Sequence, residues 1–155
     1  MLSGEEVVWP AWRGKPVHPL IHEFCIAFGS ANNKHPNYGA AMSRQIVNAI
    51  CRKFPGAEVS DPWGGGHDAW KVGGKMFACI GSTMPGVSVK TDSVETAQML
   101  IDAGVGVKAP YFHRSWVNLP WSTSRDELRY RLAASYRLVR SSLTRKAQAQ
   151  LDPFE

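Results

Sequence analysis

The chain has 155 residues, of which 44% are hydrophobic and 20% are charged. This composition is ordinary for a globular domain, and the length suits a single domain with an extension. No run of about 18 apolar residues occurs, which argues against a membrane-spanning helix. The N-terminus starts acidic, contains prolines and does not resemble a secretory signal. Three widely spaced cysteines, Cys25, Cys51 and Cys79, are typical of a reducing compartment, so we expect a cytoplasmic protein.

The net charge of +5 is unevenly distributed along the chain. Residues 124 to 146 hold seven basic and two acidic side chains, whereas residues 1 to 41 are balanced. The last long helix is therefore the basic element. Such a surface would attract nucleic acid or another polyanion. An arginine-rich helix face that is simply solvated explains the charge equally well.

Residues 1 to 41 contain four prolines and no sustained hydrophobic period, which predicts a loosely ordered extension. His18, His22 and Cys25 have a spacing that would suit a metal. We interpret that spacing as chance and expect no metal site. The domain itself is assigned to residues 42–146, and residues 147–155 are assigned to a C-terminal tail.

From Met42 onward the hydrophobic pattern is regular. Ile46, Val47 and Ile50 recur at helical spacing, which predicts a helix with Ser43 as its N-cap that continues to Phe54. Residues 57–62 are expected to be extended and WGGGHD (63–68) to form a turn. Residues 69–72 and 75–81 then form a hairpin around a Gly-Gly pair at 73–74, which permits the positive φ that such turns need.

The second strand of this hairpin raises the question of where its lysine points. Strict alternation places Lys75, Phe77 and Cys79 on one face of the strand. The opposite face then holds Met76, Ala78 and Ile80. If the Lys75 face points away from the helices, Lys75 and Phe77 form a binding ridge on the solvent side. Cys79 lies within an apolar run and is also expected in the core, which conflicts with this alternation unless both faces are partly covered.

The second half of the chain continues with alternating short elements. Residues 86–91 form a strand, Asp92 or Ser93 caps a helix that Gly104 closes, and residues 105–109 and 115–119 are two further strands. Ser124 with Glu127 three residues later predicts a capping box for the last helix. That helix carries an apolar stripe, with Tyr136 at its edge, formed by Leu128, Leu132, Ser135, Val139 and Leu143.

The order of these elements predicts the fold class. It runs helix, three or four strands, helix, two strands, helix, with hairpins in place of strand–helix alternation. We therefore expect an α+β fold, a two-layer sandwich in which an antiparallel sheet carries helices on one face.

Sequence motifs for catalysis are not found. The chain has no Gly-x-Ser-x-Gly, no His-Glu-x-x-His and no Walker loop, and the three glycines before His67 are interpreted as a turn. His113, next to Arg114, is the best lone polar candidate, but a lone histidine is more often structural. We expect neither an enzyme nor a cofactor.

Binding chemistry is better represented, because cations and aromatic residues are interleaved along the strands. Cations contact phosphates and aromatic faces stack on unpaired bases. Large aromatic residues also fill any small core, and Trp70 and Trp116 are more often core than stacking surfaces. The interleaved residues are Lys71, Lys75, Lys90, Lys108 and Arg114 with Trp63, Trp70, Tyr111, Phe112, Trp116 and Trp121.

The segments KVGGKMFACIG, VSVKTD, APYFHRSWVNL and LRYRLAASYRLVRSSL together resemble the MmcQ/YjbR-like proteins, over about residues 43–143. The resemblance implies an α+β fold akin to frataxin-like and secretion-chaperone-like domains, and DNA binding by a "double wing". Lys71, Lys75 and Lys90 match the family pattern, as do Pro110 and Trp116, whereas residues 1–41 depart from it. A weaker similarity, through GKMFA, is to the N-terminal domain of TfoX-type competence regulators.

Two functional hypotheses follow. The first is a non-enzymatic DNA-binding protein that contacts phosphates through Lys71, Lys75, Lys90, Arg114, Trp116, Arg137 and Arg140. The second is a protein-interaction or chaperone-like module that uses an exposed sheet or a dimer seam, for which Trp116, Phe112 and Trp121 should be exposed. Iron handling is disfavoured because the first helix has no clustered carboxylates.

Overall fold

The computed structural model describes residues 36–82 and 85–154, and side chains from residue 43 onward. In chain order the elements are α1 (Pro36–Cys51), β1 (Ala57–Ser60), β2 (Asp68–Val72), β3 (Lys75–Ile80), β4 (Val87–Lys90), α2 (Val94–Asp102), β5 (Val107–Lys108), β6 (Trp116–Leu119), α3 (Arg125–Ser141) and α4 (Arg145–Ala149). The expected order is confirmed, with α4 as an additional short helix. None of the helices described is long and apolar enough to cross a bilayer.

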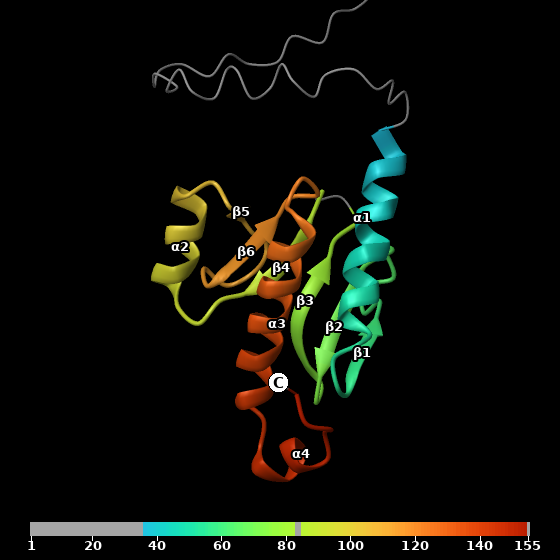
Figure 1. Ribbon diagram of the computed structural model, residues 1–155, viewed down its shortest axis with the longest axis vertical. Coiled ribbons are helices and arrows are strands. Elements are labelled where there is room, and N and C mark those ends of the chain that lie inside the picture. The colour runs from blue at the N-terminus through green and yellow to red at the C-terminus, as the bar shows by residue number, and fades with distance from the viewer. Residues whose placement is uncertain (1–35, 83–84, 155) are drawn as a thin grey trace, which may run out of the picture. The chain divides into compact units, whose positions relative to one another are not determined.

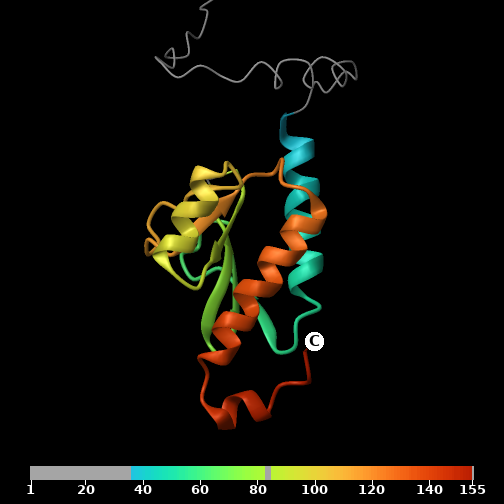
Figure 2. The same ribbon diagram turned by 60° about the vertical axis from the view of Figure 1, so that its left-hand side comes forward.

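The six strands form one antiparallel sheet in the order β1-β2-β3-β4-β6-β5. Figures 1 and 2 show α3 lying along one face of this sheet with α1 beside it. The core lies between that face and the helices. The α+β fold with an antiparallel sheet, as expected from the sequence, is therefore correct. We refer to the two sides of the sheet as the helix face and the open face.

Helix α1 is longer at its start than the sequence suggested. It begins at Pro36, where a proline is tolerated because the first-turn N–H has no helical partner. Ser43 consequently lies inside the helix, so its expected role as N-cap is wrong. The helix ends at Cys51 and a turn leads to Phe54, whose N–H bonds the Cys51 carbonyl. Residues 36–41, assigned to the extension, are helical, and the histidines at 18 and 22 with Cys25 lie outside the described residues.

The β2–β3 hairpin turns where the glycine pair predicted it. Gly73 and Gly74 have φ values of 54° and 77°, a left-handed conformation that other residues adopt only at a cost. A Cβ on Gly73 would also lie 2.8 Å from the Leu143 side chain, so the turn packs closely against the end of α3.

A β-bulge changes which residues of β3 share a face. Trp70 pairs with Ala78 and Lys71 with Met76, so Phe77 is the extra residue. Phe77 therefore joins the helix-side core with Ala78, and alternation is interrupted. Strict alternation had placed Cys79 with Phe77 and Met76 with Ala78; both groupings are wrong because of the bulge.

Ser135 of α3 fills the gap that the bulge leaves between β3 and β4. Ala78 pairs with Val89, so Phe77 and Lys90 would form the next contact of that ladder. The Ser135 hydroxyl stands between them, donating to the Phe77 carbonyl at 2.6 Å and accepting from the Lys90 N–H at 2.9 Å. This explains why a serine interrupts the apolar stripe of α3: a buried backbone donor and acceptor need a partner there.

The helix caps agree in part with the sequence. Ser93 rather than Asp92 caps α2, accepting from the Thr96 N–H. Ser124 caps α3 by accepting from the Glu127 N–H. The Glu127 carboxylate, however, accepts from Arg131 Nε at 2.7 Å instead of completing the capping box.

Side chains within residues 147–154 pack on the core. Tyr136, expected at the edge of the α3 stripe, is fully buried and stacks on Phe54 with ring centroids 4.8 Å apart. Phe154 then packs edge-on against both rings. Residues 147–155, assigned to a tail, therefore include the end of α4 and a ring that covers the core.

Candidate functional site

The open face of the sheet carries a cavity of about 580 Å³. This volume falls within the range of about 300–1,000 Å³ that is usual for pockets that hold small ligands. Its floor is formed by the two central strands, through Met76 and Cys79 of β3 and Ser88 of β4. Its full lining is Trp63, His67, Met76, Cys79, Gly81, Ser88, Pro110, Tyr111, Phe112, His113 and Trp116.

Two aromatic walls border the cavity and come from opposite ends of the strand order. The β1–β2 loop supplies Trp63, which packs edge-on against His67 with ring centroids 5.1 Å apart. The β5–β6 connection supplies Phe112, which stacks on Trp116 at 4.6 Å and 27°. Because β2 and β6 flank β3 and β4 in the sheet, the walls stand on either side of the floor.

Tyr111, on the second wall, has an unusual backbone. Its φ is 67°, and among the residues that the structure describes it alone combines positive φ with a side chain. For a bulky residue this conformation costs on the order of 1–3 kcal/mol. The side chain is also fully exposed, so no burial of the ring compensates for the strain.

His113 is fixed in one tautomer by its neighbour Ser115. The Ser115 backbone N–H donates to His113 Nδ1 at 3.2 Å, and the Ser115 hydroxyl lies 2.9 Å from the same nitrogen. Nδ1 is therefore an acceptor, so the neutral ring carries its proton on Nε2. His113 thus brings an N–H donor to a cavity whose lining is mostly carbon.

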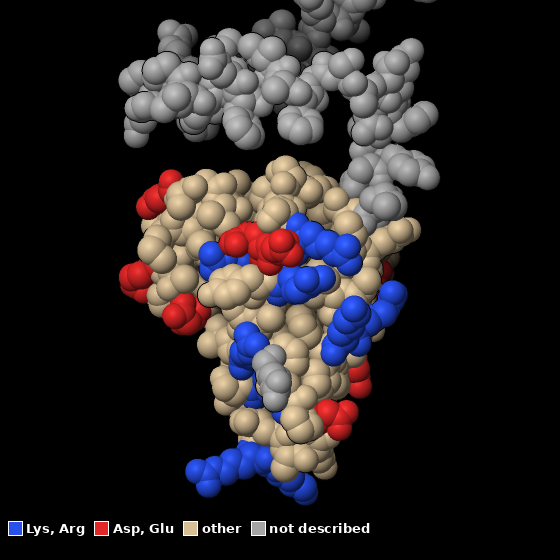
Figure 3. All heavy atoms as spheres, in the orientation of Figure 1, with Lys and Arg blue, Asp and Glu red and all other residues tan. Residues whose placement is uncertain are grey.

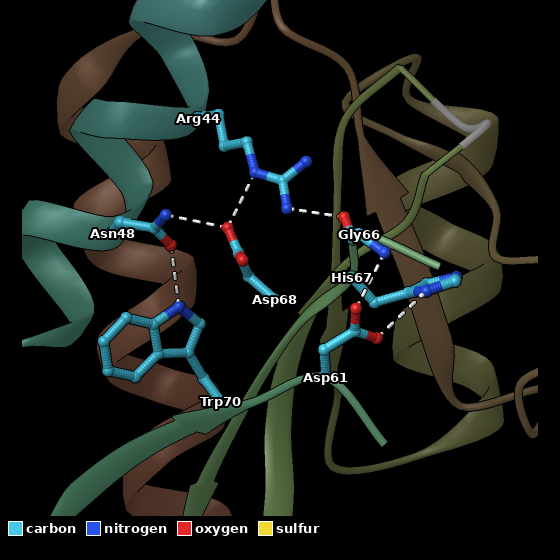
Figure 4. Close-up of polar contacts among 7 residues, drawn as sticks. All are labelled: Arg44, Asn48, Asp61, Gly66, His67, Asp68 and Trp70. Atoms are coloured by element: carbon cyan, nitrogen blue, oxygen red, sulfur yellow. Dashed lines mark hydrogen bonds and ion pairs between the residues drawn. The ribbon is translucent and has the colours of Figure 1, made fainter. Parts of the chain in front are cut away.

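The loop that carries Trp63 is organised by Asp61 (Figure 4). Its carboxylate accepts the Gly66 N–H at 2.7 Å and the Gly65 N–H at 3.4 Å. These backbone hydrogen bonds, that from Gly66 foremost, lower the pKa of Asp61. Asp61 Oδ1 also lies 3.5 Å from His67 Nδ1. The two atoms are in contact but form no hydrogen bond, and the Nδ1 atom is buried. The loop therefore holds its shape through its own polar groups.

A polar network ties this loop to α1 (Figure 4). Arg44 Nε donates to Asp68 Oδ2 at 2.7 Å, and Arg44 Nη2 donates to the Gly66 carbonyl. Asn48 donates to the same carboxylate at 2.8 Å and accepts from the Trp70 indole N–H at 2.8 Å. The Arg44 hydrogen bond, opposed by desolvation and assisted by Asn48, lowers the pKa of Asp68. This network anchors the start of β2 and so fixes the Trp63 wall.

Cys79, on the cavity floor, is buried, and desolvation raises the pKa of its thiol to about 11. It is therefore a neutral, weakly polar surface at physiological pH and no nucleophile. Together with Met76 it gives the floor a polarizable character that suits contact with an aromatic ring.

Three of the sequence-predicted site residues lie on or beside the open face. Lys71 pairs with Met76, and Lys90 pairs with Trp116, so each lysine neighbours a residue of the cavity. Trp116 itself is buried and forms part of the wall. Arg114 follows His113 but lies beside α2, in a hollow that Glu95 also lines.

The other predicted residues lie on the helix face and have partners there. Lys75 Nζ donates to the Ser142 carbonyl at 2.8 Å, so it is no part of a ridge on the open face. The Arg137 guanidinium lies 5.0 Å from the Phe154 ring centroid, and Arg140 donates to the Tyr136 hydroxyl and the Asp152 carbonyl. Figure 3 shows this side, with cations over α1, α3 and α4 and with carboxylates both at α2 and over the start of α3. The seven predicted residues therefore do not form one surface.

Sequence reasoning missed the floor of the cavity. Met76 and Cys79 follow the apolar pattern of an ordinary core strand, and only the bulge at Phe77 turns both toward the open face. Ser88 was placed correctly on the face opposite Val87, but nothing in the local sequence marked it as part of a cavity. The aromatic wall residues were recognisable as a group, since they cluster in two Gly/Pro-containing loops.

The family model for YjbR matches residues 52–138 of the chain, which runs from the end of α1 through most of α3. The chain belongs to the YjbR family. The matched region contains the strands that form the cavity floor and both wall loops. The resemblance seen in the four sequence segments is therefore confirmed.

A solved structure supports the fold of this YjbR-family chain. The crystal structure of Deinococcus radiodurans protein DR2400, which carries a DUF419 domain, superposes with a TM-score of 0.61 at 21% sequence identity. The match covers 67% of this chain and 83% of that one. No curated protein is significantly similar to the chain. At this identity the likeness establishes the fold and leaves function to be argued from the site.

Proposed function

We propose that this YjbR-family protein is a non-enzymatic DNA-binding protein that holds a single strand on the open face of its sheet. The observation that carries the proposal is the cavity with two aromatic walls, whose borders hold Lys71 and Lys90. Proteins that bind single strands combine aromatic surfaces for the bases with cations for the backbone phosphates.

The two lysines suit phosphate contacts because they are not used elsewhere. Within residues 43–82 and 85–154, the Lys and Arg side chains that form ion pairs are Arg44, Arg129 and Arg131. Lys71 faces Glu58 across β1 and β2, but these side chains form no ion pair within 4 Å. Both lysines therefore keep their donors available for an anionic backbone.

The aromatic groups are arranged for stacking and not for a flat protein contact. Trp63 is 58% exposed and Tyr111 fully exposed, one on each wall. Trp116, by contrast, is buried, and Phe112 and Trp121 are half-buried. Burial of all three of these residues would weaken the protein-interaction alternative, but Trp116 alone is buried, so the case for nucleic acid rests on the exposed Trp63 and Tyr111 and on the neighbouring lysines.

A salt titration of full-length protein against a labelled single strand and the matching duplex, read by fluorescence anisotropy, tests the proposal. We expect tighter binding to the single strand. The logarithm of affinity should fall linearly with the logarithm of salt, by about 0.7 for each phosphate contacted. In Lys71→Ala/Lys90→Ala, the slope should fall by about 1.4, because two contacts are lost.

Lys75→Ala/Arg137→Ala is the matched control, since it removes the same charge from the helix face. We expect it to keep most of the slope and affinity. Equal losses in both double variants would mean that overall charge and not the open face attracts the strand. Absence of binding to either DNA at low salt would overturn the proposed function.

A further inference from the structure

The geometry points to a more specific property of the same site, and the inference rests on the proposed function. We propose that the cavity captures one unstacked nucleobase of a bound strand, and that Tyr111 is the ring that closes over it. The ligand is thus a flat aromatic base that turns out of the bound oligonucleotide and enters the cavity on the open face of the sheet.

The dimensions and walls of the cavity suit one flat ring system. Its floor is one layer of small or flexible side chains, Met76, Cys79 and Ser88, and its sides are rings. The Phe112–Trp116 stack presents a flat surface, and Tyr111, which precedes Phe112 in the chain, also lines the cavity. A base placed there would gain stacking from one side and sulfur contact from below.

Polar atoms in the cavity are few, and besides the His67 ring they include two groups that can donate hydrogen bonds. His113 carries its proton on Nε2, as argued above. Ser88 Oγ accepts from Asn118 Nδ2 at 3.2 Å, which leaves its own hydroxyl proton to donate. Every nucleobase has ring-nitrogen or carbonyl acceptors, so two donors in an apolar cavity fit a base edge and not a phosphate, for which they provide no cation.

The strained backbone of Tyr111 gives the second, independent observation. A bulky side chain at positive φ persists only where the surrounding structure imposes it. Here the His113–Ser115 bonds and the Phe112–Trp116 stack hold the loop on one side of Tyr111. A fully exposed ring held in a costly conformation at the mouth of a cavity is expected where that ring contacts a ligand.

The test compares an intact oligonucleotide with one that contains abasic sites, using the full chain. Removing bases should lower affinity by about 5- to 150-fold, the range expected for one lost stacking contact. Tyr111→Gly should lower affinity for the intact strand by a similar factor and abolish the difference between the two strands. Glycine adopts positive φ without strain, so its unfolding midpoint should stay unchanged or rise.

Tyr130→Ala is the control, because Tyr130 is an equally bulky ring, 60% exposed, on α3. It should leave both affinities unchanged. A ribonucleotide strand forms a third arm: tighter binding to it supports base capture and overturns the assignment to DNA. A single nucleoside that binds, without any strand binding, likewise supports capture and overturns the proposed function.

Equal affinity for intact and abasic strands, with Tyr111→Gly indistinguishable from wild type, would overturn base capture while leaving DNA binding intact. Absence of binding to every strand and nucleoside would overturn both. If Tyr111 is strained, replacing it with glycine should make folding easier. Loss of the unfolding transition in Tyr111→Gly would therefore contradict the view that the tyrosine is strained.

Discussion

The two faces of one sheet differ in what their side chains do. On the helix face, Val87, Val89 and Phe77 are almost completely buried against Leu132 and Tyr136. On the open face, the same strands present sulfur atoms, a hydroxyl and lysines, and two loops raise rings around a cavity. Strand alternation, together with the bulge at Phe77, thus separates the core from the proposed binding surface, and a substitution should affect mainly one of the two.

The largest expected effect is on the helix face. Leu132→Ala removes a fully buried side chain and should lower the free energy of unfolding by about 2–5 kcal/mol, through lost burial and a cavity. Urea unfolding measures this loss. Under conditions in which the variant stays folded, its affinity for a single strand should equal that of wild type. A fall in the affinity of the folded variant would contradict the claim that helix-face substitutions affect stability and not binding.

Next in size is the network that anchors the Trp63 wall. Asp68→Asn should lower the free energy of unfolding at neutral pH by about 1.5–3 kcal/mol, because a charged acceptor of two hydrogen bonds is lost. The pKa of Asp68 is lowered in the folded chain, chiefly by Arg44. Its contribution is therefore fully present above the unfolded value of about 3.9 and is lost as pH falls through the lower folded value.

Unfolding curves measured from pH 7 to pH 2 check the direction of this pH dependence of stability. Wild type should lose stability below about pH 4 more steeply than Asp68→Asn does. Parallel curves for the two proteins would mean that the ion pair with Arg44 contributes nothing to folding.

Ser135→Ala tests whether the Ser135 hydroxyl stabilises the fold by bonding the backbone groups that the bulge leaves unpaired. Removing the hydroxyl leaves the Phe77 carbonyl and the Lys90 N–H without their partner, which should cost about 1–3 kcal/mol. Ser141→Ala is the control on the same helix, because Ser141 is exposed and its hydroxyl bonds only the Leu138 carbonyl. A Ser135 effect no larger than the Ser141 effect would mean that the bulge does not depend on α3.

The smallest effect on stability is expected on the open face. Lys71→Ala and Lys90→Ala should each change the free energy of unfolding by less than about 0.5 kcal/mol, as surface substitutions usually do. Both should nevertheless weaken binding to a single strand at low salt. A destabilisation above about 1 kcal/mol would show that these lysines act in folding, and the comparison of the two faces would lose its basis.

The sequence predicted the architecture well because hydrophobic period and turn residues are local signals. Gly73-Gly74 located the hairpin, and Ser124 located the start of α3. The faces of β3 could not be predicted, since the bulge at Phe77 arises from pairing with β2 and from the Ser135 hydroxyl, which is 58 residues away. One extra residue brought Met76 and Cys79, which strict alternation places on opposite faces, onto the same open face.

The candidate site was predictable only in part for the same reason. The loops that carry Trp63 and Tyr111 could be recognised as aromatic and rich in turn residues, but not as two walls of one cavity. That relation depends on the strand order, which places β3 and β4 between β2 and β6. Lys75 shows the reverse case: its sequence context resembled that of Lys71, yet it bonds the Ser142 carbonyl on the other face.

The most direct test of the account is an NMR titration of the labelled full chain with a short single-stranded oligonucleotide. The backbone amides of Ser88 and Asn118, the Trp63 indole and the Cys79 amide should shift progressively, whereas the amides of Leu132, Val139 and Arg137 should not. This result would locate the strand on the open face. Shifts concentrated on α1 and α3, with the cavity residues unchanged, would contradict the account and move the nucleic-acid site to the helix face.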